Sequence, residues 1–183
     1  MSQIALQRPS VKREQLSESE QAALWSALDE LTDPEIPVVT LREMGIVRAL
    51  RRGDGGVLEV VITPTYSGCP AMEQIHDDIV ARLAREGVAA RVVTQLAPAW
   101  TTDWMTPAAR EKLRAYGIAP PRTGPLAPGE APILFATRST AEVPCPLCGS
   151  TNTTETSHFG STACKALYRC LDCMEPFDHF KRI

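Results

Sequence analysis

The sequence predicts an α+β protein: a small three-stranded sheet packed with helices (α-β-β-α-β-α), followed by a small C-terminal zinc-ribbon-like domain. Two observations predict this class. Segments with helical apolar spacing alternate with short β-rich runs before residue 117, and five of the six cysteines fall within the last 39 residues. A tail that is so short and so rich in cysteine needs a bound metal or disulfide bonds in order to fold.

Composition indicates an ordinary globular protein. The 183 residues are 44% hydrophobic and 22% charged, with a net charge of −3. We expect a flexible leader over 1–16, a first domain over 17–116, a Pro/Gly-rich linker over 117–144 and a four-cysteine zinc-binding domain over 145–183. The N-terminus lacks an apolar signal segment, and no apolar run approaches the ~20 residues that span a bilayer. A cytoplasmic protein without a membrane partner is therefore expected, and its cysteines suit a reducing compartment.

The first domain is predicted to begin with a helix over about 18–31. Ser17 and Glu20 form a capping-box signature, and Asp33-Pro34 ends the helix. Its apolar residues share one face: Leu24, Trp25, Leu28 and Leu31.

Two β-rich runs, 46–50 and 57–62, are joined by Arg-Arg-Gly-Asp-Gly-Gly, which indicates a hairpin. A second helix is expected to begin with Pro70 at its first position and to end at Gly87. A third strand follows over 88–96, and a third helix runs from Thr106-Pro107 to near Gly117.

Two Cys-x-x-Cys pairs, Cys145/Cys148 and Cys170/Cys173, are separated by 21 residues. Two such turns placed face to face supply four thiolates in a tetrahedron with no open position, which is typical of structural zinc. Gly149 suits the positive φ of such a turn. The alternatives are two disulfides or four unrelated buried thiols. Iron or a [2Fe-2S] cluster would use the same four thiolates, so the metal is open between zinc and iron.

Cys69 is the sharpest candidate for chemistry in the first domain. It is predicted to lie at a helix N-terminus, where the helix dipole and free N–H groups lower a thiol pKa. The alternative is a small buried apolar residue. A hydrolase arrangement is disfavoured because His76 lies two helical turns along and the other two histidines, His158 and His179, lie in the tail.

Three further features can each be interpreted as functional or as purely structural. The loop Asp33-Pro34-Glu35 is either a solvated turn or an acidic part of a site. His76-Asp77-Asp78 scatter around a helix, which favours a solvated polar face. Cys164 is left over once four thiolates hold a metal, and is either buried and structural or a second redox-capable thiol.

Nucleic-acid binding is not expected. From residue 145 onward, four Lys/Arg balance four Asp/Glu, and a Zn²⁺ with four thiolates adds roughly −2. A phosphate-binding module needs clustered basic residues.

Two stretches together carry a family resemblance. Asp-Pro-Glu-Ile-Pro (33–37), followed by Thr-Pro-Thr-Tyr-Ser-Gly-Cys-Pro (63–70), resembles the small domain of SufT-like iron-sulfur assembly accessory proteins. The tail from Cys-Pro-Leu-Cys-Gly-Ser to Glu-Pro-Phe-Asp-His-Phe-Lys is similar to one branch of that family, the D-type (PaaD) accessory subunits of the bacterial phenylacetyl-CoA epoxidase. The resemblance covers about residues 20–183.

The resemblance implies that Cys69 is the reactive thiol or a transient ligand of iron or a cluster, with Asp33, Glu35 and Thr63 as neighbours. One thiol cannot hold a [2Fe-2S] cluster alone, so a homodimer or a client cysteine would have to share it. The partners implied are the di-iron hydroxylase and the [2Fe-2S] reductase of the epoxidase.

Two functions follow as hypotheses. The chain is a non-catalytic maturation factor for the iron-sulfur or iron centre of a partner, or it is a structural subunit with no role in metal delivery. It has no Gly-rich dinucleotide loop and no flavin fingerprint, so oxygenation by the chain itself is not expected.

Overall fold

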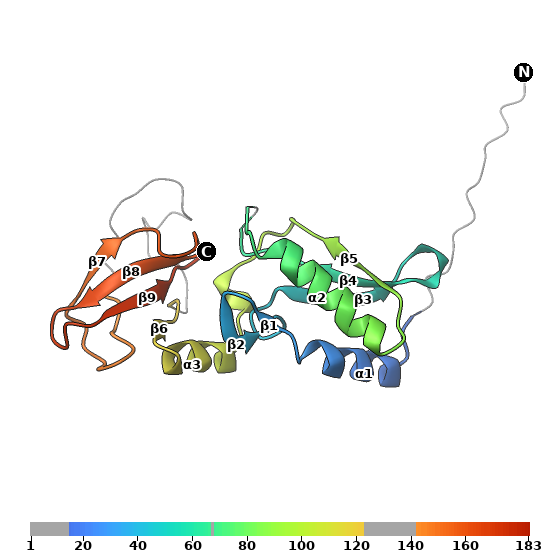
Figure 1. The fold of residues 1–183 in the computed structure, drawn as a ribbon, viewed down its shortest axis with the longest axis horizontal. Coiled ribbons are helices and arrows are strands. Elements are labelled where there is room, and N and C mark those ends of the chain that lie inside the picture. Colours follow the sequence, from blue (N-terminus) through green and yellow to red (C-terminus); the bar gives the residue numbers. More distant parts are fainter. Residues whose placement is uncertain (1–14, 67, 123–141) are drawn as a thin grey trace, which may run out of the picture.

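The computed structural model describes residues 15–66, 68–122 and 142–183, and it confirms the predicted α+β class. An α/β part and a small all-β part lie side by side (Figure 1). Most of the predicted leader and linker, residues 1–14 and 123–141, lie outside the described residues. The elements of the first part are α1 (Glu18–Leu28), β1 (Thr32–Asp33), β2 (Ile36–Thr40), β3 (Val47–Arg52), β4 (Leu58–Ile62), α2 (Met72–Arg85), β5 (Ala90–Thr94) and α3 (Pro107–Ala115). Those of the second are β6 (Ile118–Ala119), β7 (Thr153–Ser157), β8 (Lys165–Cys170) and β9 (Pro176–Phe180).

The predicted capping box starts α1. The backbone N–H of Glu20 donates to Ser17 Oγ, and Glu20 Oε2 accepts from the Ser17 N–H at 3.0 Å, so both free donors are satisfied. The helix ends at Leu28, three residues earlier than expected, because the chain then turns into β1. Leu31 still packs against the core from the turn.

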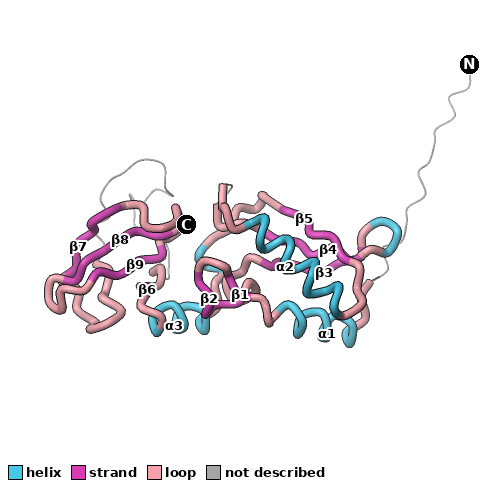
Figure 2. The backbone as a smooth tube through the Cα atoms, in the orientation of Figure 1, coloured by secondary structure: helices cyan, strands magenta, loops and turns pink. Residues whose placement is uncertain are grey.

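The central sheet has the order β3-β4-β5. β3 and β4 form the predicted antiparallel hairpin, and β5 runs parallel to β4 after the crossover helix α2 (Figure 2). Every residue of β4 is buried, because the strand lies between β3 and β5 in the sheet. Glu59 is the one charged residue among them, and it pairs with Arg51 and Arg91 from the two flanking strands.

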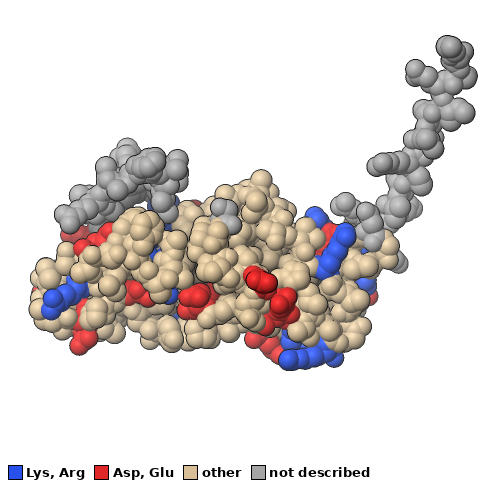
Figure 3. All heavy atoms as spheres, turned by 45° about the horizontal axis from the view of Figure 1, so that its top comes forward, with Lys and Arg blue, Asp and Glu red and all other residues tan. Residues whose placement is uncertain are grey.

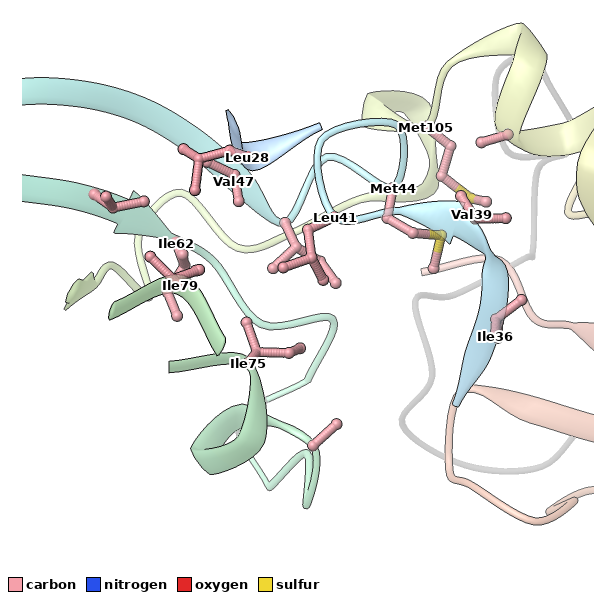
Figure 4. Close-up of a cluster of buried hydrophobic side chains, with 14 of the residues drawn as sticks. Leu28, Ile36, Val39, Leu41, Met44, Val47, Ile62, Ile75, Ile79 and Met105 are labelled. Carbon is pink, nitrogen blue, oxygen red and sulfur yellow. The ribbon is translucent and has the colours of Figure 1, made fainter. Parts of the chain in front are cut away.

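Helix α2 begins at Met72 rather than at Pro70, because Pro70 and Ala71 form a turn before it. Its inward stripe is as predicted, with Ile75, Ile79 and Leu83 buried. In Figure 4, Ile79 lies against Ile62 of the sheet. A single core cluster joins α1, the sheet and α2, and it extends through Met44 to Met105 near α3.

A short two-stranded sheet, β1-β2, was not predicted. It encloses the Asp33-Pro34-Glu35 loop, whose prolines had indicated an irregular turn. Ile36 and Val39 of β2 are fully buried, so packing of β2 on the core holds the strand in place.

The C-terminal part is a four-stranded sheet in the order β6-β9-β8-β7. Its hairpins enclose a second, smaller core cluster around Tyr168 and Phe177, whose rings stack with centroids 5.8 Å apart. β6 comes from the start of the predicted linker and pairs in parallel with β9. Strand pairing therefore ties the end of the first part to the second.

The two parts meet at a buried junction. Phe180 of β9 is fully buried and belongs to the core cluster of the first part, with its ring centroid 6.0 Å from that of Trp100. The Thr102 backbone N–H donates to the Ile183 carbonyl at 3.1 Å. Among the described residues, no helix is both long and apolar enough to cross a membrane.

Candidate functional site

The four cysteines of the two Cys-x-x-Cys pairs come together in the C-terminal part. Their sulfur atoms all lie within 4.8 Å of one another. Cys145 Sγ is 3.8 Å from Cys173 Sγ, and Cys148 Sγ is 3.6 Å from Cys170 Sγ. Tetrahedral Zn²⁺ with Zn–S bonds of about 2.3 Å places its sulfurs about 3.8 Å apart. The set therefore fits one tetrahedral metal ion.

Each Cys-x-x-Cys pair lies on a tight turn that ends in a residue with positive φ. Gly149 has φ of 78°, as predicted, and its N–H donates to the Cys145 carbonyl at 2.9 Å. Met174, with φ of 68°, stands at the matching place after the second pair, where no glycine marks the turn. The Cys173 N–H points at Cys170 Sγ at 3.5 Å, and this hydrogen bond is the largest cause that lowers the pKa of that thiol. The backbone thus favours a thiolate there.

Contacts outside the cage hold the two turns against each other. Asp172 accepts from Asn152 Nδ2 at 2.7 Å and from the Ser150 hydroxyl. The donor group contains only the four cysteines, so a tetrahedral ion would be fully coordinated by protein. Such a closed site is structural rather than catalytic.

Cys69 lies on the loop between β4 and α2 and is half-buried. Burial raises the pKa of its thiol, and the charges of Asp33 and Glu35 raise it further. The backbone of Ala71 and the side chain of Thr65 offset this only in part. The expected low pKa is therefore wrong: burial and acidic neighbours outweigh the helix N-terminus. A thiol held protonated is a poor nucleophile.

The acidic loop lies within electrostatic reach of Cys69. Asp33 is buried, and its Oδ1 accepts from the N–H groups of Glu35 at 2.8 Å and Ile36 at 3.1 Å. Its carboxylate thus caps the turn, although the turn is buried at Asp33 rather than solvated. Burial raises the pKa of Asp33, while those two hydrogen bonds lower it. Its charge nevertheless reaches the thiol of Cys69.

Thr63 and the residues after it line a pocket of about 440 Å³ at the junction of the two parts. Thr63 is 1% exposed, and its hydroxyl is the only buried side-chain polar atom in the described residues without a hydrogen-bond partner. A buried hydroxyl left unpaired costs roughly 1–3 kcal/mol. The opposite wall comes from the C-terminal part: Phe159, Ala163, Lys181 and Ile183.

Cys164 was left over in the sequence, and the structure places it at the junction. It is 9% exposed and belongs to the core cluster of the first part rather than to that of the C-terminal sheet. Its sulfur lies 3.1 Å from Thr162 Oγ1. Cys69 packs against the same cluster. Sequence spacing offered no sign of this, because 94 residues separate the two cysteines.

The remaining candidates stay apart. His76 and Asp77 are exposed on α2, as expected. Two Glu-x-x-His spacings occur, Glu73/His76 on α2 and Glu155/His158 at the end of β7. A di-iron centre needs such motifs on facing helices, whereas these lie in different parts and one begins on a strand. Lys and Arg are scattered over the face in Figure 3 and form no basic patch on it.

Comparison with family models divides the chain in two. The model of an iron-sulfur cluster assembly protein matches residues 21–94, which include Asp33, Glu35 and Cys69. The model of the PaaD zinc beta ribbon domain matches residues 129–181, which include the four-cysteine cage and Cys164.

Known proteins resemble either the first part or nearly the whole chain. A DUF59 domain of unknown function from Bacillus anthracis is 25% identical, with a TM-score of 0.48 over 52% of this chain and 92% of its own. A conserved hypothetical protein from Thermotoga maritima is 26% identical, with a TM-score of 0.43 over 54% and 95%. A protein of Escherichia coli (strain K12) named as the D-type subunit of a 1,2-phenylacetyl-CoA epoxidase is 51% identical over 162 residues, 87% of this chain and 92% of its own.

Proposed function

Since the chain belongs to the family of the D-type subunits of 1,2-phenylacetyl-CoA epoxidase, we propose that it is a non-catalytic maturation factor of such an epoxidase. It assists insertion of the iron-sulfur or iron centre of a partner subunit in phenylacetate breakdown. The clients are the [2Fe-2S] reductase or the di-iron hydroxylase. All six cysteines are free, which suits the cytoplasm.

The observation that carries the proposal is the acidic loop beside Cys69. Negative charges that raise a thiol pKa also attract a cation, and a cation that binds the sulfur displaces its proton. Asp33 and Glu35 therefore favour a thiol that acts as a metal ligand over one that acts as a nucleophile. Thiolate and carboxylate are both iron ligands. The match of residues 21–94 to an iron-sulfur assembly model supports the same role.

For the cage of Cys145, Cys148, Cys170 and Cys173 we propose resident Zn²⁺. The sulfur separations fit zinc, and four thiolates leave no position for a substrate. The ion stabilises a part whose own core is small. Cys69 would then bind metal transiently for a partner, whereas the zinc of the ribbon would serve only to stabilise its fold.

Partner metal content tests the proposal. The hydroxylase and reductase are expressed with this chain, without it, and with Cys69→Ser, and then assayed for iron and acid-labile sulfide. We expect a client to lose its centre in the second and third cases. Zinc content and thermal unfolding of the Cys69→Ser protein show that the variant is folded. Full metal centres in every sample, with poor turnover when the chain is missing, would establish the alternative of a structural subunit.

Thr63 separates function from stability in the same assay. Thr63→Val removes an unpaired buried hydroxyl at nearly constant volume, so the free energy of unfolding is expected to stay equal or rise. If the hydroxyl faces cargo or client, maturation falls although the protein is more stable. Unchanged maturation would take Thr63 out of the site.

A further inference from the structure

Cys164 belongs to the C-terminal part in sequence but packs in the core of the first part, against which Cys69 also packs. It is buried and precedes β8. The Lys181 N–H donates to the Cys164 carbonyl at 2.9 Å, which ties this segment to the end of β9. The position of Cys164 therefore depends on how the ribbon docks.

The loops that carry the two cysteines meet at one pocket. Thr65 and Tyr66, before Cys69, line one side, and Ala163, directly before Cys164, lines the other. Tyr66 packs against the shared cluster, and the charges of both cysteines raise the pKa of its hydroxyl after burial, the larger cause. The loops that carry the two thiols thus meet at one pocket, beside one tyrosine.

The charges around Cys164 overlap with those around Cys69. Burial raises the pKa of the Cys164 thiol, and the charges of Asp33 and Cys69 raise it further. Two lysines, Lys165 and Lys181, bring positive charge to Cys164. Three carboxylates oppose these lysines. Two are Asp33 and Glu35 of the acidic loop, and the third is Asp178 of β9, whose Oδ2 lies 3.6 Å from Lys165 Nζ. Asp33 therefore brings negative charge to both thiols, which suits a cation.

The unpaired Thr63 hydroxyl is an independent sign of a ligand. It is buried and lines the pocket that Tyr66 and Ala163 also line. An orphaned polar atom beside a pocket is best explained by a group that binds there.

We propose that Cys69, Cys164 and Asp33 form a second metal site, which takes a thiophilic divalent cation at the junction of the two parts. The inference rests on the proposed function, which makes Fe²⁺ the natural occupant, and it supplies from this chain the second thiol that a partner would otherwise provide. Binding releases one proton from each thiol, and no electron is transferred. The two backbone hydrogen bonds that Asp33 accepts both use Oδ1, so Oδ2 is the ligand oxygen.

The site closes on binding. Among the described residues, only the four-cysteine cage already holds three or more donor atoms within 4.8 Å of one another. Side-chain rotation of the two cysteines must therefore bring their sulfurs to one ion. A site that is loose without metal suits a transient cargo better than a resident ion.

Cobalt titration tests the site. The full chain with its zinc in place is titrated anaerobically with Co²⁺, which binds thiolates more weakly than Zn²⁺ and leaves the cage occupied. We expect one additional Co²⁺ with thiolate charge-transfer absorption. Cys69→Ser and Cys164→Ser should each weaken binding by more than the roughly 10- to 100-fold that loss of an outer-shell partner costs. Asp33→Asn should weaken it too, while Asp77→Asn, an exposed carboxylate on α2, should not.

Two results would overturn the site: no additional Co²⁺ in the wild-type chain, or equal binding by Cys164→Ser and the wild type. Dibromobimane, which fluoresces when it bridges two nearby thiols, checks the juxtaposition without cobalt, on the chain whose four cage thiols are protected by bound zinc. Bridging is expected in the wild type and absent in either serine variant, and lack of bridging in the wild type contradicts the proposal.

The proposed function is judged separately. If Cys69→Ser blocks client maturation while Cys164→Ser supports it fully, the maturation role stands and the two-thiol site is wrong. If both variants bind no Co²⁺ yet both support maturation, the site exists and the proposed function fails.

Discussion

Replacement of Phe180 by alanine tests the docking of the two parts. Phe180 is fully buried and lies on Trp100 across the junction. A buried Phe→Ala change removes the transfer free energy of the ring and leaves a cavity, together about 3–5 kcal/mol. A domain of this kind has a free energy of unfolding of about 5–15 kcal/mol. Loss of this one ring should therefore remove a large share of the stability and separate the unfolding of the two parts.

Phe159 is the matched control, since it is the same residue type in the same part. Its side chain is 60% exposed, and its ring lies against Lys181, whose Nζ is 4.3 Å from the ring centroid. A contact of that kind contributes about 0.5–1 kcal/mol when exposed. Phe159→Ala should then cost about 1 kcal/mol or less.

The assay is urea unfolding at one fixed, saturating zinc concentration, because bound metal adds to apparent stability. Tryptophan fluorescence reports the first part, and far-ultraviolet circular dichroism reports the whole chain. We expect one coincident transition for the wild type and Phe159→Ala, and a lower, split transition for Phe180→Ala. Equal midpoints for the two variants would refute the docked junction, and with it the approach of Cys164 to Cys69.

The other predictions concern the cage and the thiol. Gly149→Ala should lower the free energy of unfolding by about 1–2 kcal/mol, because its Cβ meets nothing within 4 Å and only the positive φ is strained; Met174→Gly should raise it at the matching position. The reverse order in chemical denaturation would show that the two turns are not equivalent. Removal of zinc by a strong chelator should abolish the ribbon signal in circular dichroism, and survival of that signal would mean that the ion is dispensable. Asp33→Asn removes a charge that raises the pKa of Cys69, so alkylation of Cys69 should become several-fold faster near neutral pH and its pH midpoint should move down; a midpoint as high as in Asp77→Asn would contradict the electrostatic argument.

Much of the fold follows from local sequence rules. The capping box of Ser17 and Glu20, the inward stripe of α2 and the glycine-marked hairpin each depend on residues a few positions apart. The same is true of the metal knuckles, where two pairs of cysteines on tight turns leave few other ways to satisfy four thiols. Such features were predictable because neighbours in sequence are neighbours in space.

Features that depend on burial and on contacts between distant segments follow only from the folded structure. A position at a helix N-terminus predicts a low pKa for the Cys69 thiol. Burial, together with the charges of Asp33 and Glu35, raises that pKa instead. Met174 adopts positive φ because the second knuckle requires that turn, not because the residue favours it. Cys164 meets the first domain at the same junction at which Phe180 of β9 is buried. Local sequence patterns thus predicted the family, the fold class and the cage, whereas the charges that surround Cys164 depend on how the two parts dock.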